Sequence, residues 1–152
     1  MQLHQLIASV ARIGYVKGGG TFAAIVYGII WFLLPAGFCN SAWQVITTAA
    51  IIAVGTWSST NVDKIWGKDS SKVVIDEVAG MAITLLYVPH HIIFLLTGLI
   101  LFRFFDIVKP LGIRQMEKLP TGWGVMADDV LAGLYSVIVL QLIAYFSIAY
   151  IK

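Results

Sequence analysis

Charged residues and cysteine are scarce in this chain of 152 residues, and each scarcity excludes a class of protein. Only 12% of the residues are charged, 59% are hydrophobic, and the mean hydropathy is +0.88. Because a soluble domain of this length needs more polar surface, the composition predicts a membrane protein. A net charge of +2 is too small to indicate a nucleic-acid partner. The single cysteine, Cys39, excludes an internal disulfide and a cysteine-rich metal cluster.

We also expect neither a linker between domains nor a cleavable signal peptide. No tract rich in Pro, Ser and Gly divides residues 1–152, so we expect one membrane-embedded domain. The first 20 residues lack the basic start, apolar run and cleavage site of a secretory signal. Apolar residues at helical spacing between Leu3 and Ile13 predict a short amphipathic helix on the membrane surface or, alternatively, a solvated helix end.

Several apolar runs are present, and they predict an all-α bundle of about five transmembrane helices. Three of these helices are expected at residues 22–34, 43–57 and 130–151. A further apolar region, from Val73 to Phe102, is too long for one helix and contains Pro89, so we expect a hairpin there. The two helices of the hairpin are expected near residues 72–88 and 91–109.

Basic residues set the predicted orientation of this bundle. Three lysines lie in the polar loop from residue 58 to residue 72, which the positive-inside rule places in the cytoplasm. A hairpin at Pro89 then leaves nine of the ten Lys and Arg residues on the cytoplasmic side and only Lys152 on the other. His90 and His91 belong to the outer turn, far from the carboxylates, so we expect no ligand role for them.

Adjacent carboxylates open two of the apolar segments. Asp76 and Glu77 begin one of them without a local cation. A carboxylate buried in apolar surroundings normally requires a counter-ion, a metal or a raised pKa. Asp128 and Asp129 stand before the last apolar run, where a helix N-cap is the alternative role of Asp128 and leaves Asp129 unexplained.

A glycine lies one helical turn after two of these aspartates. Gly80 follows Asp76, and Gly133 follows Asp129. Small residues at this offset let another helix backbone approach the carboxylate face. We therefore expect a close helix contact beside the carboxylates.

Basic residues accompany the acidic ones in the segment 102–110. Arg103 and Asp106 share one helix face, and Lys109 extends the polar stripe before the helix ends. The position of these residues at membrane depth favours a functional role. A structural ion pair is the alternative. Arg114 follows in an interfacial segment, as a phosphate ligand or as an ordinary surface charge.

A glycine-rich segment, residues 14–21, directly precedes the first apolar run and contains Lys17. Its backbone N–H groups and the N-terminus of the following helix favour an anion, and Lys17 adds a positive charge. A flexible linker is the alternative for this segment.

The helix ends that carry these carboxylates and basic residues are expected to converge, and this combination indicates metal-assisted phosphate chemistry. Carboxylates alone would repel a phosphate, whereas a divalent cation such as Mg²⁺ is held by carboxylates and takes phosphate and water as further ligands. No Cys or His nucleophile is suitably placed, so we expect direct attack by a water that the metal or a carboxylate activates, with an aspartyl-phosphate intermediate as the alternative. A small ion-coupled transporter, with charges spread through the membrane, and a structural membrane subunit are the rival classes.

Three blocks of the sequence resemble the signature blocks of the phosphatidylglycerophosphatase A family. They are Val73–Met81 (VVIDEVAGM), Phe102–Pro110 (FRFFDIVKP) and Gly122–Gly133 (GWGVMADDVLAG). Asp69 also falls where the family tends to have an aspartate before the Asp-Glu pair. The resemblance implies a Mg²⁺-dependent phosphatase of the bacterial inner membrane that converts phosphatidylglycerol phosphate to phosphatidylglycerol and inorganic phosphate. It implies membrane lipids as partners and leaves the oligomeric state open.

The resemblance also extends to the glycine-rich segment. Lys17 and the pair Gly20-Thr21 correspond to the Lys and Gly-Thr positions of a family block near the N-terminus, which adds Thr21 to the phosphate-binding residues. The sequence departs from that block at Gly19, where the family usually has Pro, and at residues 23–24, which are Ala-Ala in place of Gly-Ser.

The predicted site has two parts. The expected catalytic carboxylates are Asp76, Glu77, Asp106, Asp128 and Asp129, and the expected Mg²⁺ ligands among them are Asp76, Glu77, Asp128 and Asp129. The expected phosphate-binding residues are Lys17, Thr21, Arg103, Lys109 and Arg114.

Overall fold

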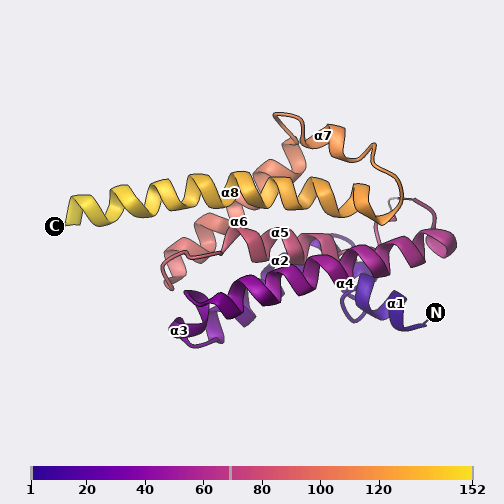
Figure 1. The fold of residues 1–152 in the computed structure, drawn as a ribbon, viewed down its shortest axis with the longest axis horizontal. Coiled ribbons are helices and arrows are strands. Elements are labelled where there is room, and N and C mark those ends of the chain that lie inside the picture. Colours follow the sequence, from indigo (N-terminus) through magenta and orange to yellow (C-terminus); the bar gives the residue numbers. More distant parts are fainter. Residues whose placement is uncertain (1, 69, 152) are drawn as a thin grey trace.

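The computed structural model describes residues 2–68 and 70–151, and this part of the chain is helical, with no strand (Figure 1). The all-α prediction is confirmed. The helices are α1 Gln2–Ala8, the short 3₁₀ helix η1 Ile13–Tyr15, α2 Gly19–Leu33, α3 Ala36–Cys39, α4 Ala42–Trp66, α5 Ile75–Thr84, α6 Ile92–Val108, α7 Ile113–Met116 and α8 Gly122–Ile151.

The short helix α5 lies at the centre of the bundle, where it packs against α2, α4, α6 and α8. The two longest helices, α4 and α8, run along the long axis on either side of it (Figure 1). Ala42–Trp66 and Gly122–Ser147 are long and apolar enough to cross a membrane, whereas the apolar helix α2 has 15 residues. The expectation of about five spanning helices therefore stays a prediction.

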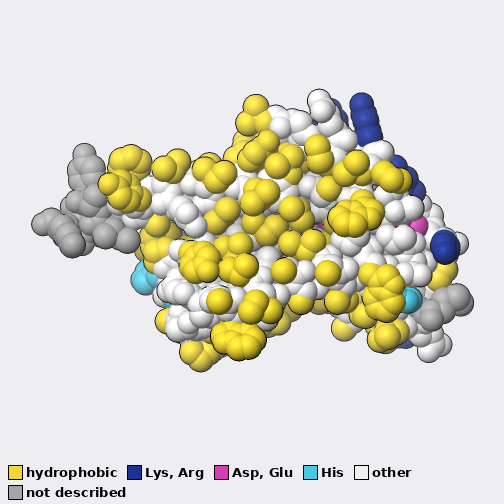
Figure 2. Space-filling view, in the orientation of Figure 1, with side chains coloured by type: hydrophobic (Ala, Val, Ile, Leu, Met, Phe, Trp, Pro, Cys, Tyr) yellow, Lys and Arg dark blue, Asp and Glu magenta, His cyan; other side chains and the backbone are white. Residues whose placement is uncertain are grey.

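Side chains of different character occupy different parts of the surface. Hydrophobic side chains cover most of the face in Figure 2, and Lys and Arg gather at the end where α1 and the start of α8 lie. Leu33, Ile100 and Ile107 are each more than two-thirds exposed although fully apolar. Such a surface suits a bundle surrounded by lipid and charged at one end.

The first arm of the predicted hairpin is shorter than expected. A helix was predicted near residues 72–88, but α5 has ten residues, about 15 Å at 1.5 Å per residue. Before its start, Val74 has a non-helical φ of −142°, and its N–H donates to the carbonyl of Ala8 at 2.8 Å. The second arm, α6, lies within two residues of the prediction, and the turn falls around Pro89 as expected.

Glutamine side chains make the early end of α5 possible inside an apolar bundle. The amide of Gln44 donates to the carbonyl of Leu85 at 2.8 Å, and that of Gln141 donates to the carbonyl of Leu86 at 3.1 Å. The N–H of Tyr87 donates to Gln44 Oε1 at 3.4 Å. Irregular backbone is tolerated in apolar surroundings only where its polar groups find such partners.

Three other predicted boundaries are wrong, and one of them is the start of the last helix, which was predicted at residue 130 and lies at Gly122. The amphipathic helix predicted from Leu3 to Ile13 ends at Ala8, because residues 10–12 have positive φ angles of 45°, 53° and 75° and leave the helical region. The loop predicted to begin at residue 58 is instead the last part of α4, which continues to Trp66 and stops at Gly67, with φ of 83°.

The predicted close contact beside the carboxylates is present between α5 and α8. A methyl group at Gly133 would clash with the carbonyl oxygen of Gly80, and one at Gly80 would lie 2.8 Å from the carbonyl oxygen of Asp129. The two backbones therefore touch where only glycine fits. Asp76 and Asp129 each lie one turn before these glycines, so the crossing brings both aspartates to the same place.

Candidate active site

A cavity of about 640 Å³ lies among the segment before α2, the start of α5, the end of α6 and the start of α8. All five predicted carboxylates line it, together with four of the five predicted phosphate-binding residues, Lys17, Thr21, Arg103 and Lys109. Arg114 does not line this cavity and is exposed on α7. Asp69 and Lys152 lie outside the described residues.

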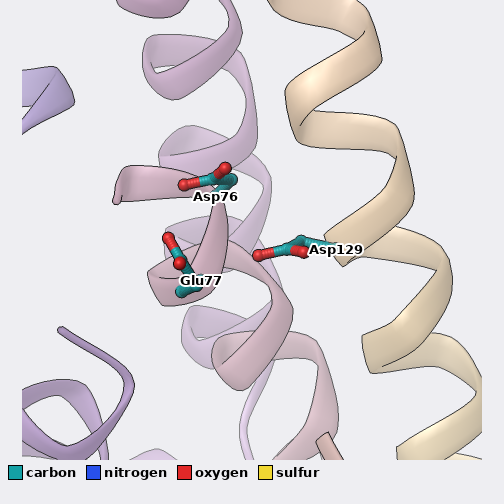
Figure 3. A group of neighbouring side chains, drawn as sticks. All are labelled: Asp76, Glu77 and Asp129. Carbon is teal, nitrogen blue, oxygen red and sulfur yellow. The ribbon is translucent and has the colours of Figure 1, made fainter. Parts of the chain in front are cut away.

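Three carboxylates meet at the inner end of this arrangement. Asp76 and Glu77 come from the first turn of α5, and Asp129 reaches toward them from α8 (Figure 3). One oxygen atom from each of the three residues lies within 4.8 Å of the others. Asp76 and Asp129 are buried, at 8% and 3% exposure. These three residues form what we call the acidic triad.

The acidic triad fits a divalent cation. Asp76 Oδ1, Glu77 Oε2 and Asp129 Oδ2 are buried and have no hydrogen-bond partner among the described residues. The nearest ion-pair contact is from Arg103 Nη1 to Glu77 Oε1, at 3.9 Å. Three carboxylates this close repel one another, and carboxylate oxygens are the type of ligand that Mg²⁺ prefers.

Asp106 is paired differently from the acidic triad. Arg103 Nη1 lies 2.7 Å from Asp106 Oδ2, one turn apart on α6. The ion pair that was the structural alternative is therefore present. Because the same guanidinium also approaches Glu77 and lines the cavity, the pair is part of the site as well.

Asp128 is also held by a cation. Lys109 Nζ donates to Asp128 Oδ2 and to Glu117 Oε1, both at 2.6 Å. Burial alone would lower the pKa of Lys109, but these two carboxylates outweigh it and raise the pKa above its ordinary value. The N-cap role considered for Asp128 is wrong, because α8 begins six residues earlier, at Gly122.

The glycine-rich segment forms one wall of the cavity. Residues 14–21 all line it, so this segment is not merely a linker. A methyl group at Gly20 would collide with Glu77 Oε1, which shows how closely the start of α2 approaches the acidic triad. Absence of a Cβ at this position allows that approach.

Sequence reasoning missed several residues of the site. Ser70, Ser71 and Lys72 line the cavity, yet they were assigned to an ordinary cytoplasmic loop. Their position directly before Asp76 was the available signal. Glu117 was also missed, and it lies eight residues after Lys109, whose Nζ donates to it.

The histidines lie away from the site, as expected. His90 Nε2 lies 3.3 Å from the carbonyl oxygen of Trp31, and its ring stacks on Phe32, both near the end of α2. The cavity adjoins the start of the same helix, about 20 Å away at 1.5 Å per residue.

Comparisons with known proteins identify the family to which the chain is similar. Residues 6–144 match the family model for phosphatidylglycerophosphatase A. A Bacteroides thetaiotaomicron protein, provisionally named a phosphatidylinositol-3-phosphatase, is 45% identical over 132 residues, 80% of each chain. The phosphatidylglycerophosphatase A of Haemophilus influenzae is 47% identical over 79 residues (51% of this chain, 48% of the relative), and that of Escherichia coli is 30% identical over 131 residues (83% and 72%). No solved structure matches the chain.

Proposed function

Because the chain belongs to the phosphatidylglycerophosphatase A family and is therefore a phosphatase, we propose that it removes the terminal phosphate of phosphatidylglycerol phosphate. The products are phosphatidylglycerol and inorganic phosphate. The observation that carries the proposal is the meeting of five carboxylates and four cations around one cavity of a largely apolar chain. A transporter would instead have its charges spread along the path across the membrane.

In this proposal the enzyme depends on Mg²⁺, and the acidic triad holds it. The unpaired oxygens of Asp76, Glu77 and Asp129 support this assignment. When bound, Mg²⁺ supplies positive charge that offsets the substrate phosphate and makes a water more acidic. A role of Asp128 as a further ligand stays a prediction, because its Oδ2 accepts the hydrogen bond from Lys109.

The other residues of the cavity bind the phosphate and move protons. Lys17, Thr21 and Arg103 are the proposed phosphate ligands, since all three line the cavity. Water attacks the phosphorus atom, the bond to the glycerol oxygen breaks, and that oxygen takes up a proton to become a hydroxyl. We assign the acceptance of the water's proton to Asp106 or Asp128, the two carboxylates outside the acidic triad.

The proposed setting is the cytoplasmic side of a bacterial inner membrane. In this arrangement α2, α4, α5, α6 and α8 are embedded in the bilayer, with the short α5 reaching only part of the way across. The gathering of Lys and Arg at the end of the bundle near the start of α8 supports it (Figure 2). A lipid head group reaches such a site while its tails stay in the bilayer.

A second substrate merits testing, because the Bacteroides thetaiotaomicron relative is provisionally named for phosphatidylinositol 3-phosphate. Purified protein should be given, with Mg²⁺, phosphatidylglycerol phosphate or phosphatidylinositol 3-phosphate at equal surface concentrations. A soluble phosphomonoester should be tested separately. We expect phosphate release to be fastest from phosphatidylglycerol phosphate and negligible from the soluble ester. Faster release from the inositol lipid would reassign the substrate, and release from neither lipid would refute a lipid phosphatase.

A further inference from the structure

The four cations of the cavity differ in their partners. Arg103 contacts Asp106 and Glu77, and Lys109 contacts Asp128 and Glu117. Lys17 and Lys72 form no ion pair with any residue between positions 2 and 68 or 70 and 151. Their charge is therefore available to a ligand. Lys17 lies in the glycine-rich segment that precedes α2, whereas Lys72 has no role in the function proposed above.

Aromatic rings hold Lys72 at the edge of the cavity. Its Nζ lies 5.4 Å from the centre of the Tyr15 ring and 5.7 Å from that of the Trp66 ring. These two rings meet edge to face, with centroids 6.0 Å apart, and Tyr15 itself lines the cavity. Aromatic faces attract an ammonium without neutralising its charge, so they position the cation and leave it free to bind an anion.

The backbone around Lys72 is fixed as well. A methyl group at Gly14 would collide with the carbonyl oxygen of Lys72, so the two segments touch at this point. The adjoining residue, Tyr15, supplies the ring beneath the ammonium. The contact at Gly14 thus brings Tyr15 to Lys72.

We propose that Lys72, placed by Tyr15 and Trp66, is a second anion position that binds the phosphodiester group of the lipid substrate. This inference rests on the proposed function. Both candidate substrates carry two phosphate groups, a terminal monoester that is hydrolysed and a phosphodiester that joins the head group to diacylglycerol. The acidic triad and Lys17 serve the first group. Lys72 lies four residues before Asp76, in the cavity wall, and serves the second.

Binding of a lipid that has only the phosphodiester tests the assignment without catalysis. Short-chain phosphatidylglycerol should be titrated calorimetrically into the purified full-length protein, its Lys72→Met variant and a Lys64→Met control. Lys64 lies on α4 and does not line the cavity. We expect Lys72→Met to weaken binding about tenfold, the loss of one charged hydrogen bond, and Lys64→Met to have no effect. Lys72→Arg should restore most of the affinity, and equal affinities of wild type and Lys72→Met would overturn the proposal.

Comparison of two substrates within one preparation removes any effect of partial unfolding. Phosphatidic acid has a terminal monoester and no phosphodiester. The ratio of kcat/KM for phosphatidylglycerol phosphate to that for phosphatidic acid should fall about tenfold in Lys72→Met. An unchanged ratio would contradict a phosphodiester site. If the wild type releases no phosphate from either lipid, the proposed function fails, and the titration with phosphatidylglycerol still decides the role of Lys72.

Discussion

Buried polar groups have hydrogen-bond partners at the C-terminal end of α5 and lack them at its N-terminal end. At its C-terminal end, the buried carbonyl of Leu85 accepts a hydrogen bond from the side chain of Gln44. At its N-terminal end, the acidic triad keeps three buried oxygens without a hydrogen-bond partner among the described residues. Ten residues separate a satisfied end from an unsatisfied one.

This difference separates stability from function within one helix. The glutamines stabilise a break in the backbone that the fold needs, since an unpaired buried carbonyl is costly. Three close carboxylates with Arg103 at 3.9 Å from Glu77 as their nearest ion-pair contact destabilise the fold by mutual repulsion and burial. Such an arrangement is expected where a ligand supplies the missing positive charge, so the comparison assigns the chemistry to the N-terminal end of α5.

The largest expected effect comes from removing charge at the unsatisfied end. Asp76→Asn and Asp129→Asn should each lower kcat/KM by more than about 100-fold. This loss is larger than the one expected for a residue that only hydrogen-bonds to a metal ligand. In the absence of Mg²⁺, neither variant should unfold at a lower temperature than the wild type, because each removes a repelling charge. Near-normal phosphate release by both variants would refute the role of the acidic triad.

A smaller loss is expected from separating the helices that bring the triad together. Gly133→Ala should lower activity about 100-fold, because the added methyl group would meet the backbone of Gly80 and a displacement by about 1 Å misplaces Asp129. Overpacking should also lower the free energy of unfolding by about 1–3 kcal/mol. Gly37→Ala is the matched control, since a methyl group there meets no atom within 4 Å. Parallel activity and unfolding measurements that show no difference from Gly37→Ala would contradict the close crossing.

The satisfied end should respond in stability rather than in chemistry. Gln44→Leu leaves the carbonyl of Leu85 without its donor and should lower the free energy of unfolding by about 1–3 kcal/mol. The kcat of the folded fraction should remain close to that of the wild type. Gln115→Leu, at an exposed position on α7, serves as the control. A large fall in kcat with unchanged thermal unfolding in detergent would reverse the assignment of the two ends.

The smallest effect is expected outside the cavity. Arg114 is exposed on α7 and does not line the site, so Arg114→Ala should change kcat/KM by no more than about twofold, the scale of a weak surface interaction. Steady-state kinetics with phosphatidylglycerol phosphate measures this directly. A tenfold loss would restore Arg114 as the phosphate ligand that its sequence position indicated.

Local patterns were sufficient to select the carboxylates that the fold brings to one cavity. Carboxylates at the start of apolar runs are costly enough to stand out, and a glycine one turn later marks a close helix contact, so Asp76 and Asp129 were assigned from residue type and spacing alone. Pro89 likewise predicted the turn of the hairpin. The resemblance to the family added Thr21, which residue chemistry alone had not assigned.

The remaining features depend on contacts between distant segments. The early end of α5 requires Gln44, some forty residues away in the chain, and hydropathy continues without a break past Thr84. The folded chain is likewise needed to show that Glu117 is the partner of Lys109 and that aromatic rings lie beside Lys72. Propensity along the sequence carries no information about such partners.

The proposal of a metal-dependent lipid phosphatase is tested most directly by the rate of phosphate release from phosphatidylglycerol phosphate. The rate should be measured with the purified protein in detergent, before and after addition of excess chelator. We predict release with Mg²⁺, loss of release in chelator, and recovery when Mg²⁺ is restored in excess. An unchanged rate in chelator would contradict a metal role for the acidic triad.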